Sequence, residues 1–304
     1  MRIGLVAVDG HSNFPNLALM KLSAWHKEQG DTVEWAIPLF GEYDRVYKSK
    51  VFTFTPDDYT PWNCEVLKGG TGYRDFSTVL TYEQEHVCPD YTLYPGFDSA
   101  LGFTTRGCVN KCPWCVVPSK EGPLRPSADI DEFLSGRNKV TLLDNNILAH
   151  PHGIQQLEKI AERQLYLDCN QGMDARLVDD NIAKILASIK WQHGRIRFAA
   201  DTTPMVGVVK QAVRRLRLAG YTGEFFIYCL LHGDIHECVE RIIDLRSYDK
   251  KLYIHAQPYI DYVGTKPPRW QKDLAYYCNK RMIYAKVELK DFMPRKNFRY
   301  MQYL

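Results

Sequence analysis

The sequence predicts an α/β protein with two parallel-sheet units, a small N-terminal one and a larger one that follows it. Three observations lead to this prediction. Apolar strand-like segments alternate with segments of helical periodicity along most of the 304 residues. After residue 97 this alternation continues through six strand–helix units, which predicts parallel strands with right-handed crossovers. Glycine and polar residues follow most of the strands, as expected where strands enter loops.

The N-terminal part, residues 1–92, has the pattern of a small Rossmann-like domain. Asn13 and Pro15 begin its expected helix, and Gly30 ends it. In such a domain a ligand lies beyond the carboxyl ends of the strands. The expected strands are residues 3–8, 32–37, 50–55 and 64–72.

The central part, residues 93–264, contains the longer series of strands and helices. Its strands are expected at residues 100–105, 140–146, 165–171, 195–201, 224–231 and 252–258. Its helices are expected at residues 129–135, 153–163, 179–188, 206–219 and 236–245. A last helix, at residues 268–282, opens the C-terminal part, residues 265–304.

The composition is that of a globular protein without a membrane anchor. Hydrophobic residues make up 45% of the chain and charged residues 25%. No apolar run approaches the roughly 18 residues that a membrane span needs, and the apolar stretch after Met1 is too short for a signal peptide. Nine cysteines, an odd number, favour a reducing compartment over a disulfide framework. We therefore expect a cytoplasmic protein.

Three of the cysteines lie in one short run with the spacing C-x3-C-x2-C: Cys108, Cys112 and Cys115. The run directly follows the first strand of the central part, in a loop that contains glycine. Three thiolates on one loop can hold three irons of a [4Fe–4S] cluster and leave the fourth iron open. Structural zinc is one alternative, but it needs four ligands, usually from two pairs of closely spaced Cys or His residues. Inert thiols are the other alternative.

This cysteine run, with Trp114 before its last cysteine, resembles the cluster motif of the radical S-adenosylmethionine (SAM) superfamily. The resemblance implies that the six strands form a partial (β/α)6 barrel of the TIM type, with the cluster loop after the first strand. It also implies that the open iron binds the amino and carboxylate groups of SAM. An electron then cleaves SAM to methionine and a 5′-deoxyadenosyl radical, which abstracts a hydrogen from a substrate. A flavodoxin or ferredoxin is the expected reductant.

Polar residues at the strand ends are the expected contacts of SAM. By this resemblance residues 144–146 hold the amino group, and Arg176 pairs with the carboxylate. Trp114 lies against the adenine, and Asp201 accepts from the ribose hydroxyls. The full expected set is Trp114, Asp144, Asn145, Asn146, Asn170, Gln171, Asp174, Arg176 and Asp201. Helix caps and turns are the ordinary alternative for the residues at the strand ends, and packing under the cluster loop is the alternative for Trp114.

The N-terminal part loosely resembles the cobalamin-binding domain of some radical SAM proteins. Asp9-Gly-His11 follows its first strand, Ser49 precedes the third, and Gly69-Gly70 ends the fourth. Phe14 departs from the pattern, because the motif has a glycine there and a ring crowds a closely approaching corrin. The sequence therefore weighs against cobalamin, and cobalamin-dependent C-methylation is the alternative reaction.

Positive charge is concentrated in the C-terminal part. It holds ten Lys and Arg residues against three Asp and Glu, a local charge of +7, whereas the whole chain carries +3. Basic residues interleaved with aromatic ones suit contact with phosphates and stacked bases. A nucleotide or RNA is therefore the first substrate class and a peptide the second. The alternative is a solvated helix and arm whose aromatic rings pack against the barrel.

Two function classes lie outside radical SAM chemistry. An iron–sulfur electron-transfer or regulatory protein binds a cluster without cleaving SAM and needs a four-cysteine site. A nucleic-acid-binding module rests on the basic C-terminal part alone. Methylthiotransferase chemistry is disfavoured, because neither end of the sequence has a second group of three cysteines. Arg106 and Lys111, beside the cysteines, are expected to tune the potential of a cluster.

Overall fold

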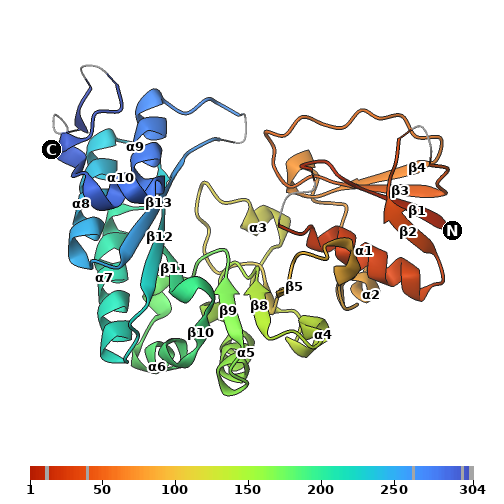
Figure 1. The fold of residues 1–304 in the computed structure, drawn as a ribbon, viewed down its shortest axis with the longest axis horizontal. Helices are drawn as coiled ribbons and strands as arrows, with labels where there is room; N and C mark the ends of the chain where they lie inside the picture. The colour runs from red at the N-terminus through yellow and green to blue at the C-terminus, as the bar shows by residue number, and fades with distance from the viewer. Residues whose placement is uncertain (11–13, 39–40, 262–263, 296–297, 301–304) are drawn as a thin grey trace.

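The computed structural model describes residues 1–10, 14–38, 41–261, 264–295 and 298–300. It is a mixed α/β protein with parallel sheets, which confirms the predicted class (Figure 1). The N-terminal sheet has the strand order β2-β1-β3-β4, with every neighbouring pair parallel. Its strands are β1 (Arg2–Ala7), β2 (Thr32–Trp35), β3 (Arg45–Ser49) and β4 (Glu65–Gly69).

The expected third strand, residues 50–55, is wrong, and β3 lies just before it. The strand β3 is hard to recognise in the sequence because it contains charged residues. Lys48 is buried, with its ammonium paired to Asp58. Residues 51–55 instead form turns, and the main-chain N–H groups of Val51 and Phe52 donate to the carboxylate of Asp9.

The N-terminal helix α1 (Leu17–Glu28) begins later than expected. Asn16 caps it, since its side chain accepts from the Leu19 N–H at 3.2 Å. The expected first residue, Asn13, lies outside the described residues. A short helix that the sequence did not indicate, α2 (Tyr82–Glu85), follows the sheet and is held by a capping box from Thr81 to Gln84.

All six expected strands of the central part are present, in two parallel sheets. The first sheet has the order β10-β9-β8-β5 and the second β11-β12-β13. A parallel bridge between Met173 and Phe198 joins them. The strands are β5 (Ala100–Gly102), β8 (Lys139–Leu142), β9 (Tyr166–Cys169), β10 (Lys190–Trp191), β11 (Arg195–Ala199), β12 (Glu224–Leu231) and β13 (Leu252–Pro258).

The expected first strand of the central part is divided. After β5 the chain enters β6 (Thr105–Arg106), which pairs antiparallel with β7 (Arg125–Pro126). The cysteine run and the short helix α3 (Val117–Lys120) lie between these two strands. The cysteine segment is therefore the tip of a hairpin that rises from the carboxyl end of β5.

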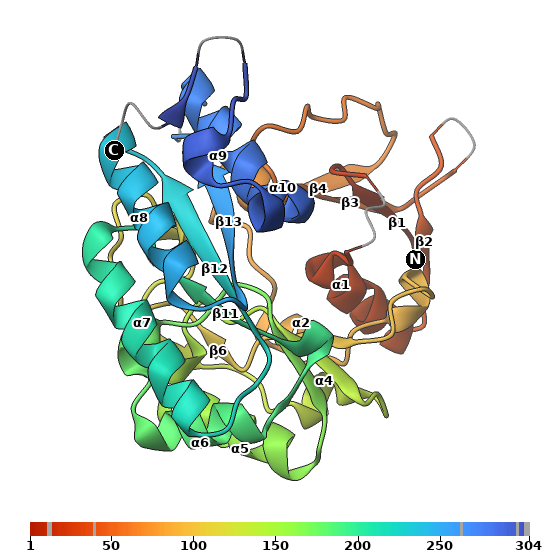
Figure 2. The same cartoon turned by 60° about the vertical axis from the view of Figure 1, so that its left-hand side comes forward.

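Helices line one side of the central strands, in sequence order (Figure 2). They are α4 (Asp131–Leu134), α5 (Pro151–Glu162), α6 (Asp180–Ser188), α7 (Thr203–Leu218) and α8 (Ile235–Tyr248). Alternate residues of β12 are buried toward these helices, and the residues between them are partly exposed on the opposite face. No helix among the described residues is long and apolar enough to cross a membrane.

The N-terminal and central parts share an apolar contact. Leu17 and Met20 of α1 pack with Tyr91 and with Leu101 of β5. The Tyr91 hydroxyl also donates to the Phe133 carbonyl at 2.6 Å and accepts from the Leu101 N–H at 3.1 Å. A buried ring thus anchors the segment that connects the two parts.

The C-terminal part packs against the second central sheet. Such packing was the alternative to a nucleic-acid-binding surface. It forms α9 (Arg269–Asn279) and α10 (Arg281–Lys286). Among its described residues four rings are buried: Tyr277, Tyr284, Phe292 and Tyr300. Arg281 pairs with Glu224 at the amino end of β12, so α10 lies away from the carboxyl ends of the strands.

Asn279, the last residue of α9, closes the edge of the second central sheet. Its side-chain oxygen accepts from the Ala256 N–H, and its side-chain nitrogen donates to the Ala256 carbonyl, each at 2.9 Å. Ala256 lies in β13, the last strand of that sheet. One amide therefore satisfies both main-chain groups of an edge residue.

Candidate functional site

The three cysteines lie together at the tip of the hairpin, each half-buried. Burial raises the pKa of the Cys112 and Cys115 thiols, and the neighbouring thiols raise it further. Gly107 precedes the run with φ +79°, and a Cβ there would lie 2.3 Å from the Pro123 carbonyl oxygen. Only glycine fits this entry to the loop.

No three His, Cys, Asp or Glu side chains among the described residues are close enough together to hold one metal ion. The three cysteine ligands of a [4Fe–4S] cluster meet a different requirement. Each binds a separate iron, so their sulfurs surround the cluster and do not converge on one point.

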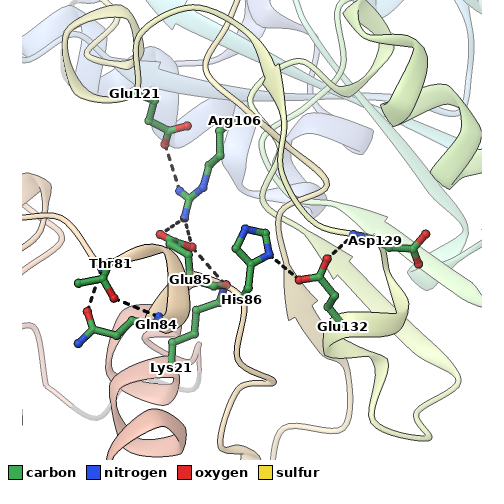
Figure 3. Close-up of polar contacts among 9 residues, drawn as sticks. All are labelled: Lys21, Thr81, Gln84, Glu85, His86, Arg106, Glu121, Asp129 and Glu132. Atoms are coloured by element: carbon green, nitrogen blue, oxygen red, sulfur yellow. Dashed lines mark hydrogen bonds and ion pairs between the residues drawn. The ribbon is translucent and has the colours of Figure 1, made fainter.

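A chain of charged groups holds the base of the hairpin (Figure 3). Arg106 donates to Glu85 of α2 at 2.8 Å and lies 3.5 Å from Glu121. Lys21 pairs with Oε2 of Glu85 at 3.1 Å, the oxygen to which Arg106 makes its second contact. Burial raises the pKa of Glu85, but Arg106 and Lys21 outweigh it, so this pKa lies below its ordinary value.

Glu121 connects this chain to the cysteine loop. One of its carboxylate oxygens accepts from the Gly107 N–H at 3.0 Å and from the Asn145 amide at 2.9 Å. Arg106, a residue predicted to tune the potential of a cluster, lies between these two glutamates and holds the loop. Lys111 is exposed.

Asp144 does not face the site. It is 5% exposed, and its carboxylate accepts four hydrogen bonds, from the N–H and the hydroxyl of both Thr104 and Thr105. Burial raises the pKa of Asp144, and these four donors oppose that effect. Its oxygens are thus already committed to the segment that leads into the cysteine run.

Asn146, two residues later, faces the cysteines. Its side-chain nitrogen lies 3.8 Å from the sulfur of Cys108 and 3.4 Å from an oxygen of Asp174. Asn110, inside the cysteine run, donates to the same oxygen at 3.1 Å. The side-chain oxygen of Asn146 is buried without a hydrogen-bond partner among the described residues.

Asp174 and Arg176 follow β9 and are already paired with each other. The guanidinium of Arg176 donates to both carboxylate oxygens of Asp174, at 2.8 and 2.6 Å. Burial raises the pKa of Asp174, but Arg176 and Asn110 outweigh it, and the pKa lies below its ordinary value. Arg176 remains 48% exposed, so part of its guanidinium is free to meet an anion.

Trp114 extends from the hairpin to the ends of β11 and β12. Its ring lies 4.6 Å from the ring of His232, and its side chain hydrogen-bonds Asp201. An oxygen of Asp201 also accepts from the Leu230 N–H at 2.8 Å. Burial raises the pKa of Asp201, and these hydrogen bonds oppose it.

The remaining two expected residues are less involved. Asn170 contributes its carbonyl, which accepts from the Tyr228 hydroxyl at 3.0 Å. Gln171 is exposed beside it. The structure therefore brings Asn146, Asp174, Arg176, Trp114 and Asp201 around the cysteines, and it uses Asp144 and Asn145 to hold the loop.

Asn110 and Glu121 are among the residues of this site that the sequence did not predict. A signal existed for Asn110, since it is a polar residue between two expected ligands. Glu121 lies six residues beyond Cys115 and has no distinguishing spacing. Glu85 is far upstream and meets Arg106 only through the packing of α2 on the central part.

The partly exposed face of β12 and β13 continues from this site. Phe226 and His255 stack with their centroids 5.6 Å apart, and Tyr228 meets His255 edge-on at 5.8 Å. A contact between Arg197 and Asp168 lies beside them. Burial lowers the pKa of His255, which favours the neutral form of its ring.

The carboxyl end of the N-terminal sheet is occupied by the chain itself. Asp9 accepts from Val51, Phe52 and the Thr55 hydroxyl. At Gly70 an added Cβ would lie 2.3 Å from the Lys50 carbonyl oxygen, so this glycine serves a contact between two loops. His11, the last residue of the Asp9-Gly-His11 run, lies outside the described residues.

A search of protein-family models finds none that matches the chain.

Proposed function

We propose that the protein is a radical SAM enzyme, in which the central strands form a partial (β/α)6 barrel and the N-terminal part is a Rossmann-like domain. The observation that carries the proposal is the position of the cysteine hairpin. It rises from the carboxyl end of β5, and polar side chains that follow β8, β9 and β11 surround it. Sites of parallel α/β folds lie at this end of the strands.

The residues present suit an iron–sulfur cluster and SAM. Cys108, Cys112 and Cys115 would hold three irons, and a glycine-only entry shapes the loop that carries them. The buried oxygen of Asn146, which has no hydrogen-bond partner in the described parts of the chain, would offer an acceptor for an ammonium group beside Cys108. When bound, a cluster with an open iron supplies the electron for reductive cleavage of SAM.

The chain's own residues would bind and orient the cofactor. Arg176 offers the exposed part of its guanidinium to a carboxylate, with Asp174 holding it in place. Trp114 and His232, whose rings are tilted by 36° to each other, would provide an aromatic surface for the adenine. Asp201 keeps one oxygen on the Leu230 N–H, which leaves its other oxygen for Trp114 or a ribose hydroxyl. The SAM contact expected of Asp144 is not part of this proposal.

The substrate would lie on the partly exposed face of β12 and β13. A nucleotide or RNA remains the first class and a peptide the second, on the charge of the C-terminal part. A flavodoxin or ferredoxin in the cytoplasm would supply electrons. Because four C-terminal rings are buried, a substrate base would not stack on those rings.

The decisive test is reductive SAM cleavage by protein purified without oxygen. We expect about four irons per chain, and 5′-deoxyadenosine on addition of dithionite and SAM. The matched control replaces three cysteines outside the hairpin, Cys64, Cys88 and Cys238, by Ala, and we expect it to retain iron and activity. The same change at Cys108, Cys112 and Cys115 should remove both. A full complement of iron in that second variant would refute the proposal.

A further inference from the structure

The hydrogen-bond donors around the three sulfurs are distributed unevenly. Within the described ranges Cys108 has two: the Asn110 main-chain N–H at 3.4 Å and the Asn146 side-chain nitrogen at 3.8 Å. Cys115 has one, the Val117 main-chain N–H. Of these donors only Asn146 uses a side chain, so it is the one that a substitution can remove without changing the loop.

The orientation of the Asn146 amide is set by its neighbours. Asp174 and the Cys108 sulfur are both acceptors, and both lie on the nitrogen side of the amide. A flipped amide would place its oxygen against a carboxylate and a thiolate, so the N–H side must face them. Arg176 and Asn110 hold the Asp174 carboxylate in place, which makes this orientation rigid.

We propose that Asn146 is a positioning residue that raises the reduction potential of the cluster by donating an N–H to Cys108. The inference rests on the proposed function. Reduction adds negative charge to the cluster and its sulfurs, so an N–H that points at a sulfur stabilises the reduced state more than the oxidised one. Asn146 is 1% exposed, and the low local dielectric strengthens the interaction.

The test is a redox titration of the purified protein, followed by the electron paramagnetic resonance signal of the reduced cluster, with no SAM present. Asn146→Leu keeps the size of the side chain and removes the N–H. We expect its midpoint to move to more negative potential, with about a tenfold lower ratio of reduced to oxidised cluster at a fixed potential, or ~59 mV for one electron. Asn146→Asp should move it further, because a carboxylate then faces the sulfur.

The matched control is Asn170→Leu, the same change after the neighbouring strand β9, which keeps the main-chain carbonyl that accepts from the Tyr228 hydroxyl. Its midpoint should equal that of the wild type. An unchanged midpoint in Asn146→Leu with full iron content would overturn the inference. If that variant binds no iron, Asn146→Ser decides, since its hydroxyl is too short to reach the sulfur and the same negative shift is expected. Absence of iron from the wild type would instead refute the proposed function.

Discussion

The N-terminal sheet and the first central sheet place an aspartate at the same position and use it in the same way. Asp9 follows β1, and its carboxylate holds the loop that follows the neighbouring strand, β3. Asp144 follows β8, and its carboxylate holds the segment that follows the neighbouring strand, β5. Both residues look like ligand contacts in the sequence, and both anchor loops.

The two sheets differ in what the anchored loop carries. The loop held by Asp9 presents Phe52 and Phe54, a stacked and exposed pair. The segment held by Asp144 leads into the cysteines, which meet side chains from three other strands. A polar strand end therefore identifies the edge where a site can form, and the residues on the neighbouring loop decide whether one does.

The largest expected effect is a difference in stability between variants of Asp144 and Asp9, because Asp144 is buried and Asp9 is partly exposed. Asp144→Ala leaves four donors without an acceptor in a buried place, and we expect it to lower the free energy of unfolding by about 4 kcal/mol. Asp9→Ala, at a partly exposed position, should cost about 1 kcal/mol. Urea unfolding of the iron-free proteins measures both. Equal losses of unfolding free energy in the two variants would contradict the expectation that Asp144 contributes more to stability than Asp9.

A smaller effect is expected at the link between the two parts. Arg106→Met keeps the length of the side chain but removes its contacts with Glu85 and Glu121. We expect a loss of about 1–2 kcal/mol, together with a lower iron content. Arg137→Met, in which the changed residue stacks on Tyr91 and makes no contact with either glutamate, is the control.

The stability difference between the wild type and Arg106→Met should depend on pH. The pKa of Glu85 is lower in the folded protein than its ordinary value of about 4.3. Its stabilising effect is therefore complete above that value and is lost as the pH falls through the lowered pKa. The difference between wild type and Arg106→Met should shrink below about pH 4. A constant difference down to pH 3 would show that Glu85 is not the partner that matters.

The smallest effect is an expected lack of binding at the N-terminal sheet. Because its glycines and Asp9 already contact the chain's own loops, we expect no visible spectrum of hydroxocobalamin to survive desalting of the mixed protein. Free cobalamin run alone over the same column is the control. A retained spectrum that changes in a His11→Ala variant would break the comparison and make the two sheets functionally equivalent.

Periodicity predicted the strands well where one face is apolar, as in β12, whose alternate residues are buried. It failed at β3, because a buried lysine there depends on a distant carboxylate. The site shows the same limit at finer scale. Residues 144–146 were expected to act together, but they face the β5 segment, Glu121 and Cys108 in turn. Which neighbour each side chain meets depends on tertiary packing that the spacing of residues does not contain.

Asn279 has a consequence for the behaviour of the protein in solution. A terminal strand with free N–H and C=O groups is a template on which another chain can add a strand, leading to domain swapping or fibrils. At Ala256 both groups are engaged by a side chain from the protein's own helix. The Asn279 amide makes the two hydrogen bonds that Ala256 would otherwise offer to a further strand, so another chain cannot form them while Asn279 is in place. Growth of the sheet by intermolecular pairing would first have to detach the end of α9 from β13.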